Sequence, residues 1–356
     1  MPRSVHQLVP NLAFGDAISQ QALTLRRLLR GMGFGSEIFA EHVDAQLAGE
    51  ARSYRELRNR AGPDVAVVYH FSIGSEVTDV YRLLPNPRVL VYHNITPPEF
   101  FRGVNAKVAA LCARGREELA ALRVHSALAV ADSEFNRREL EAIGFERTTV
   151  FPIVLDPDRY VSRPIDRLER AYRDGHVNFL HVGRLVPNKR IEDVLKVFYF
   201  YRRRINPDSR LFLVGIDTDM EIYSVALRQL IHDLGLSGIA LAGRATQREL
   251  VTYYRLAHVY LCMSEHEGFC VPLLEAMHFG VPVIAYAAGA VPETLGGAGA
   301  LVMRKDFPEI AELAGLVSEA GRVRESLIVA GRDRVRQFFP ESLQPRLREL
   351  VDSIWP

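Results

Sequence analysis

The sequence predicts an α/β protein with two doubly wound, parallel-sheet domains of the Rossmann type. Short apolar runs alternate with longer amphipathic stretches, and this alternation occurs twice, on either side of a polar segment at 155–175. Strand–helix alternation is typical of parallel sheets whose faces are covered by helices. The 356 residues also exceed what one hydrophobic core usually serves. We expect the two sheets to face each other across a cleft at the carboxyl ends of their strands.

Each expected element rests on local patterning. The strands expected in the first half are Val5–Val9, Val65–Tyr69, Val89–Tyr92 and Ala127–Val130, and those in the second half are Val177–Val182, Leu211–Val214, Ile239–Ala242, Val259–Met263 and Val281–Ala285. The expected helices include Ile18–Met32, Val104–Arg123, Ile191–Arg204, Glu221–Leu234 and Gln247–Leu256.

These elements predict an N-terminal domain at 1–160, a proline-bearing linker at 161–175 and a C-terminal domain at 176–335. Residues 336–356 are helical in pattern. We expect this last helix to cross back to the N-terminal domain.

The composition is that of a globular chain with a large core. Hydrophobic residues make up 48% and charged residues 24%, and a net charge of +1 gives no indication of a nucleic-acid partner. No run approaches the ~20 apolar residues needed to cross a bilayer, and the N-terminus has no signal-peptide pattern. We expect a cytoplasmic protein. Arginine-rich helical faces leave a peripheral membrane contact open.

The three cysteines, Cys112, Cys262 and Cys270, lack the spacing of metal ligands. Two of them lie in or beside the apolar run Val259–Met263. We therefore expect free thiols in a reducing compartment, with no bound metal and no cofactor.

The segment SEHEGFCVPLLEAM at 264–277 carries the strongest functional signal. It follows an expected strand, and Pro272 suits the first turn of a helix. Glu267 lies in the loop, and Glu275 is expected in the first helical turn. The backbone N–H groups between the two acids can bind phosphate oxygens at the helix N-terminus; these belong to Gly268, Phe269, Cys270 and Val271.

This segment resembles the E-x7-E motif of the retaining GT-B glycosyltransferases of family 4. A second segment, VGRLVPNKR at 182–190, resembles the strand–loop–helix with which that family grips the donor diphosphate through an Arg and a Lys, matched here by Arg184 and Lys189. Two cations at a strand end can neutralise the charge on a departing diphosphate. A third segment, GAVPETLGGAG at 289–299, also resembles the family, and we interpret it as cleft wall.

The first half resembles the same family more loosely. In FGDAISQQA at 14–22, Gly15 matches the glycine loop that approaches the donor phosphate, with an ordinary turn as the alternative. Asp16 is either a helix N-cap or an acceptor contact. In ADSEFNRREL at 131–140, the resemblance places Ser133 near the cleft, and helix capping explains it equally well.

His93 directly follows the expected strand Val89–Tyr92, in the segment YHNITP. It should therefore lie at a carboxyl end, on the cleft side of its sheet. The resemblance implies that His93 positions the donor sugar. A loop histidine held by hydrogen bonds is the alternative.

The resemblance implies a retaining transfer of a hexose from a nucleotide-diphosphate sugar, which is a co-substrate, to a saccharide acceptor. GDP-mannose and UDP-glucose are the candidate donors. The acceptor is expected to be lipid-linked, as in bacterial polysaccharide synthesis, with a small-molecule glycoside as the alternative. The catalytic set would be His93, Glu267, Arg184 and Lys189, with Glu275 holding the ribose. A sugar-nucleotide epimerase, a phosphorylase of related fold and an inactive partner subunit that binds nucleotide sugar remain alternatives.

Overall fold

The computed structural model describes residues 3–60 and 62–355, and these form two compact units. The first comprises Met1–Pro98, Lys107–Val154 and Phe338–Pro356. The second comprises Glu99–Ala106 and Leu155–Gln337. No helix within the described residues is both long and apolar enough to cross a membrane.

The first unit is built on a parallel sheet with the strand order β3-β2-β1-β4-β5-β6-β7. The strands are β1 (Ser4–Leu12), β2 (Ile38–Val43), β3 (Arg52–Ser53), β4 (Val65–Phe71), β5 (Arg88–Tyr92), β6 (Leu128–Ala131) and β7 (Thr148–Val150). The helices are α1 (Ala17–Gly31), α2 (Val77–Leu83), α3 (Ala106–Leu122), α4 (Glu134–Ala142) and α13 (Pro340–Asp352). The short 3-10 helices of this unit are η1 (Ala45–Leu47), η2 (Tyr54–Arg60) and η4 (Arg123–His125), whereas η3 (Pro98–Phe101) begins at Pro98 and continues into the second unit.

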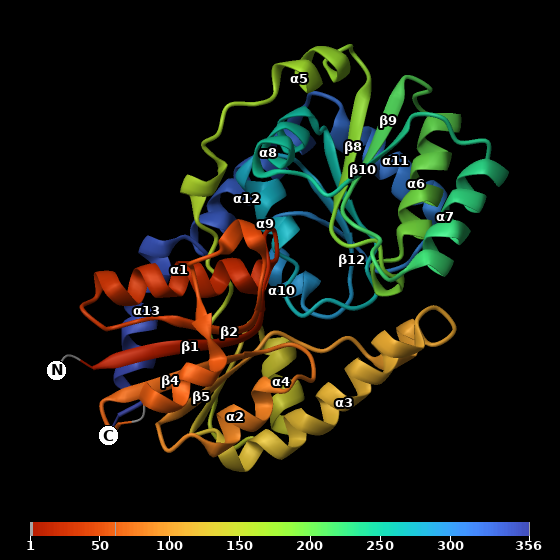
Figure 1. Ribbon diagram of the computed structural model, residues 1–356. Coiled ribbons are helices and arrows are strands. Elements are labelled where there is room, and N and C mark those ends of the chain that lie inside the picture. Colours follow the sequence, from red (N-terminus) through yellow and green to blue (C-terminus); the bar gives the residue numbers. More distant parts are fainter. Residues whose placement is uncertain (1–2, 61, 356) are drawn as a thin grey trace. The chain divides into compact units, whose positions relative to one another are not determined.

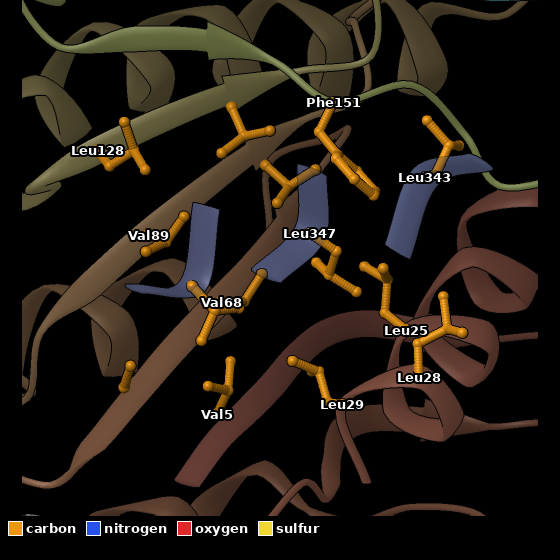
Figure 2. Close-up of a cluster of buried hydrophobic side chains, with 14 of the residues drawn as sticks. Val5, Leu25, Leu28, Leu29, Val68, Val89, Leu128, Phe151, Leu343 and Leu347 are labelled. Atoms are coloured by element: carbon orange, nitrogen blue, oxygen red, sulfur yellow. The ribbon is translucent and has the colours of Figure 1, made fainter. Parts of the chain in front are cut away.

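The C-terminal helix α13 completes the core of this unit (Figure 1). Its buried residues Leu343, Leu347 and Val351 are four apart in sequence and so share one helix face. Figure 2 shows Leu343 and Leu347 converging with side chains of β1, α1 and β4, including Leu25 and Val68. The apolar stripe of α13 therefore covers the same sheet face as α1.

The second unit contains a parallel sheet with the order β10-β9-β8-β11-β12-β13. The strands are β8 (Val177–Val182), β9 (Ser209–Val214), β10 (Ile239–Gly243), β11 (Val259–Cys262), β12 (Val283–Tyr286) and β13 (Ala300–Val302). Numbered within the unit, this is the order 3-2-1-4-5-6 of a doubly wound nucleotide-binding sheet. The central strands are largely buried because helices cover both faces, and their buried residues are mostly apolar, with Asn178 and His181 of β8 as exceptions.

The helices of the second unit are η5 (Pro157–Tyr160), α5 (Asp166–Tyr172), η6 (Pro187–Lys189), α6 (Ile191–Arg204), α7 (Glu221–Asp233), α8 (Gln247–Leu256), α9 (Val271–His278), α10 (Val291–Leu295), α11 (Phe307–Ser318) and α12 (Arg322–Arg336). Figure 1 shows α6, α7 and α11 on one side of the strands and α8, α9 and α12 on the other.

The predicted fold class, two doubly wound parallel sheets, is confirmed. Every expected strand is present, but the sequence analysis missed β2, β3, β7 and β13. Three of these have only two or three residues, and the fourth, IFAEHV, mixes polar with apolar residues. The polar segment at 155–175 has no strand, as expected, but contains the short helix α5.

Candidate functional site

The two strongest sequence motifs meet at one ion pair in the second unit. Lys189 ends η6, in the loop that follows β8, and Glu267 lies in the loop between β11 and α9. Lys189 Nζ lies 2.6 Å from Glu267 Oε1, and their side chains are only 17% and 8% exposed. Burial alone would lower the pKa of Lys189, but the Glu267 carboxylate outweighs it and raises that pKa above its ordinary value. Lys189 therefore keeps its positive charge at neutral pH.

Neighbouring backbone holds the Glu267 loop in place. Ala290 N–H donates to the Glu267 carbonyl at 2.9 Å. Gly289 has a φ of 55°, and a Cβ there would lie 2.4 Å from the same oxygen, so only glycine fits. Asn188, next to Lys189, donates from Nδ2 to the His266 carbonyl at 3.1 Å. The segment at 289–299 thus holds the backbone of Glu267 in position.

Arg184 lies two residues beyond the end of β8 and is exposed. Its guanidinium has no hydrogen-bond or ion-pair partner among the described residues, which leaves it available to an anion. The backbone before it is tightly packed, because a Cβ on Gly215 would lie 1.8 Å from the Gly183 carbonyl oxygen. The loops after β8 and β9 can approach this closely only because residue 215 is glycine.

Helix α9 begins at Val271 with Pro272 in its first turn, as predicted. Cys270 is its N-cap and has a φ of 75°, in the left-handed region that non-glycine residues rarely adopt. The expectation that Glu275 lies in the first turn is wrong. It lies in the second, because the helix starts four residues before it, and its side chain faces the interior.

Glu275 accepts two hydrogen bonds from buried tyrosines. Tyr160 Oη and Tyr254 Oη each lie 2.7 Å from a different carboxylate oxygen of Glu275. Burial, and then the Glu275 charge, raise the pKa of both tyrosines well above the ordinary value, so both hydroxyls remain donors. Each carboxylate oxygen is thus already engaged by protein. Ribose binding by Glu275 stays a prediction.

Among the described residues, one group of side chains has its possible ligand atoms close enough together to hold a metal ion. Ligand atoms of Cys262, Glu267 and Cys270 lie within 4.8 Å of one another, and the two Sγ atoms are 4.0 Å apart. The Lys189 ammonium already neutralises the carboxylate of this group. A divalent cation there would face a neighbouring positive charge.

In the first unit, His93 is the centre of a buried hydrogen-bonded chain. Its Nδ1 lies 2.8 Å from Asp132 Oδ2, and its Nε2 lies 2.8 Å from His70 Nδ1. His70 Nε2 continues to Gln7 Oε1 at 2.9 Å, and Gln7 Nε2 donates to the Ala22 carbonyl. The His93 side chain is only 1% exposed. The histidine lies at the carboxyl end of β5, as expected, with both ring nitrogens bonded to protein.

The acceptor Gln7 Oε1 fixes the positions of two protons in this chain. Gln7 Oε1 can only accept, so His70 Nε2 carries a hydrogen. Burial, and then His93, lower the pKa of His70 well below its ordinary value, so its Nδ1 is unprotonated and accepts from His93 Nε2–H. The His93–Asp132 contact must then hold one further proton, on either partner. Burial raises the pKa of Asp132, although His93 opposes it.

The other candidate residues of the first unit lie at or just before the N-termini of helices. Gly15 has a φ of 80° in the turn between β1 and α1. Asp16 caps α1, accepting from Ser19 N–H at 2.8 Å, and Ser133 caps α4, accepting from Asn136 N–H at 3.2 Å. The capping interpretations of Asp16 and Ser133 are confirmed. Ligand contacts for Gly15, Asp16 and Ser133 stay predictions.

The sequence did not predict the residues that hydrogen-bond to His93 and Glu275. Asp132 directly follows β6, so its place at a carboxyl end could have been recognised. Tyr160 lies in the polar segment and Tyr254 within α8, and no local pattern links either to Glu275.

Residues 163–334 match the family model described as "Glycosyl transferases group 1". The chain is 30% identical over 215 residues to the GDP-mannose-dependent alpha-(1-6)-phosphatidylinositol monomannoside mannosyltransferase of Mycobacterium tuberculosis, covering 56% of this chain and 54% of that protein. It is 27% identical over 167 residues to O-antigen chain mannosyltransferase B of Escherichia coli, covering 46% and 42%. The chain thus spans about half the length of these curated relatives.

The crystal structure of HepE from Anabaena in complex with UDP-glucose is similar over 99% of this chain and 100% of that one, with a TM-score of 0.74 and 18% identity. This likeness shows the fold, which is GT-B. Residues 163–334 match the group 1 glycosyl transferases, and the chain is a distant homologue of bacterial mannosyltransferases. The resemblance found from the E-x7-E segment is confirmed.

Proposed function

We propose that the protein is a retaining glycosyltransferase that moves a hexose from a nucleotide-diphosphate sugar to a saccharide acceptor. The Lys189–Glu267 ion pair carries this proposal. It joins, at the carboxyl ends of β8 and β11, the two motifs by which the chain resembles family 4, and both lie in the region that matches the family model. Ligands of doubly wound sheets bind at this edge.

The charges around this pair suit a nucleotide-diphosphate sugar. Lys189 and Arg184 would stabilise the diphosphate as negative charge develops on it. Glu267 would accept hydrogen bonds from sugar hydroxyls. The N–H groups of residues 268–271 would bind the same diphosphate or the donor sugar at the start of α9.

For the chemistry we propose attack from the face that the diphosphate leaves. The acceptor hydroxyl forms the new bond to the anomeric carbon as the carbon–phosphate oxygen bond breaks, and the departing phosphate takes the hydroxyl proton. This order keeps the anomeric configuration without a covalent intermediate. A trapped glycosyl-enzyme adduct would contradict it.

We further propose GDP-mannose or UDP-glucose as donor and a lipid-linked saccharide as acceptor. The M. tuberculosis relative is named as GDP-mannose-dependent and acts on a phosphatidylinositol monomannoside, and the HepE structure contains UDP-glucose. The E. coli relative acts on the O-antigen chain. A nucleotide sugar is named for the M. tuberculosis relative and for the HepE structure, and the acceptors in the names of the two relatives favour a membrane-derived acceptor, which a peripheral membrane contact would bring within reach.

Thermal unfolding in the presence of UDP, GDP, dTDP, ADP and their sugars tests the donor. A ligand that binds only the folded state at 100 times its Kd adds about 2.7 kcal/mol to stability, so the preferred base raises the midpoint selectively. Product analysis with that donor and lipid-linked acceptors then tests transfer and anomeric retention. Donor conversion without acceptor would instead indicate an epimerase, and binding without turnover would indicate an inactive partner subunit.

A further inference from the structure

We propose that Cys262 and Cys270 form a reversible disulfide modification site that weakens nucleotide binding at the adjacent Lys189–Glu267 pair. The coupling to nucleotide binding rests on the proposed function, whereas the formation of the bond does not. Cys262 ends β11, Cys270 is the N-cap of α9, and both thiols are buried and free. Their Sγ atoms lie 4.0 Å apart, so bond formation at ~2.05 Å requires a closure of about 2 Å.

The backbone at Cys270 supports a function for this thiol. Its left-handed conformation, with φ 75° and ψ 67°, is one that glycine adopts without strain and other residues adopt at a cost. A cysteine is nevertheless present, and its Sγ is directed at Cys262. Strained non-glycine residues cluster at functional sites.

The surroundings make Cys262 the more reactive thiol. A hydrogen bond from Cys270 lowers the pKa of Cys262, although burial opposes this shift. The same contact, followed by burial, raises the pKa of Cys270. Because the thiolate is the reacting form, Cys262 would attack an oxidant first and Cys270 would resolve the product.

The reaction balances with a peroxide as oxidant. The Cys262 thiolate attacks one peroxide oxygen, the O–O bond breaks, and the products are a sulfenic acid and water after protonation. Cys270 sulfur then attacks the sulfenic sulfur, the S–O bond breaks, and a second water leaves with the Cys270 proton. Two thiols are oxidised to one disulfide, and one peroxide is reduced to two waters.

Formation of the disulfide would act directly on the loop from Glu267 to Cys270. Glu267 to Cys270 is a short, continuous stretch whose carbonyls are anchored at Ala290 N–H and at the Thr294 hydroxyl. Pulling its end toward β11 displaces the Glu267 carboxylate relative to Lys189. We expect the dissociation constant of the preferred nucleotide to rise at least about tenfold, corresponding to 1.4 kcal/mol.

The test treats the purified protein with hydrogen peroxide in the presence of a chelator, alkylates the remaining thiols and maps the peptides by mass spectrometry. The expected product has Cys262 linked to Cys270 and Cys112 still alkylated, and dithiothreitol reverses both the bond and the loss of nucleotide binding. Cys262→Ala and Cys270→Gly should form no bond, and the Cys270→Gly change suits the left-handed backbone. Cys112→Ala should form it normally.

The absence of this disulfide, or over-oxidation of each thiol without pairing, would overturn the proposal. A disulfide that leaves nucleotide affinity unchanged would overturn its coupling to the site. If the reduced protein binds no nucleotide, the proposed function fails while peptide mapping still decides whether the bond forms.

Discussion

Lys189 and Glu267 lie 78 residues apart in the sequence and only 2.6 Å apart at their charged atoms. Each has the other as its counter-charge, in a setting where the carboxylate is almost fully buried. In such a pair neither charge can be removed without leaving the other uncompensated. The same pair is where the proposed donor diphosphate and sugar would bind.

Lys189→Ala and Glu267→Ala should each lower turnover about 10²–10³-fold, because each removes a charge-stabilising group from the proposed site. Steady-state kinetics with the identified donor measures the effect, and circular dichroism verifies folding. Lys196→Ala is the matched control, since Lys196 pairs with Asp193 on α6 at a more exposed position. Near-normal turnover in either site variant would show that the site is assigned wrongly.

Asp132→Ala should destabilise the protein by roughly 1–3 kcal/mol, because it leaves His93 Nδ1 buried without its hydrogen-bond partner. Asp132→Asn should cost less, since the amide can donate to a neutral His93 Nδ1. Urea unfolding at neutral pH measures both. Equal losses for the two variants would contradict the proposed proton arrangement.

Tyr160→Phe and Tyr254→Phe should each cost roughly 1.5–3 kcal/mol of unfolding free energy, because each removes a hydrogen bond to the buried Glu275 carboxylate. The double variant should show coupling, since both hydroxyls serve one group. Tyr253→Phe is the control, because the Tyr253 hydroxyl has no hydrogen-bond partner among the described residues. Losses no larger than that of the control would argue against two bonded tyrosines at Glu275.

The second unit should lose stability on acidification through His181. Its Nδ1 donates to the Leu261 carbonyl, its Nε2 has no partner within the described part of the chain, and burial lowers its pKa from 6.5 to about 4. A histidine with a depressed pKa stabilises the fold above pH 6.5, and this contribution is lost as the pH falls toward 4.

The loss should reach about 1.4 kcal/mol at pH 5.5 and roughly 3 kcal/mol below pH 4. Between pH 7.5 and 5.5, the unfolding free energy of wild type should fall by about 1.4 kcal/mol more than that of His181→Asn. The exposed His232→Asn variant should follow wild type. Parallel curves for wild type and His181→Asn would show that His181 does not titrate as described.

The alternation of apolar runs and amphipathic stretches was enough to predict both sheets, because long strands buried on two faces leave a continuous apolar signal. It was not enough for β13 or β7, which have three residues each and little patterning of their own. Glu275 was predicted in the wrong turn of its helix, because the start of α9 depends on the left-handed backbone of Cys270, which no sequence pattern indicates.

The sequence by itself determined which residues are candidates: Arg184, Lys189 and Glu267 stand in motifs that follow predicted strands, and parallel strands bring their carboxyl ends to one edge. Only the tertiary structure decided how those candidates are held. The pairing of Lys189 with Glu267, the two tyrosines on Glu275 and the chain from Asp132 to Gln7 join residues from distant elements. Local sequence carries no record of such pairings, because they depend on which side chains the packed sheets place within hydrogen-bond distance.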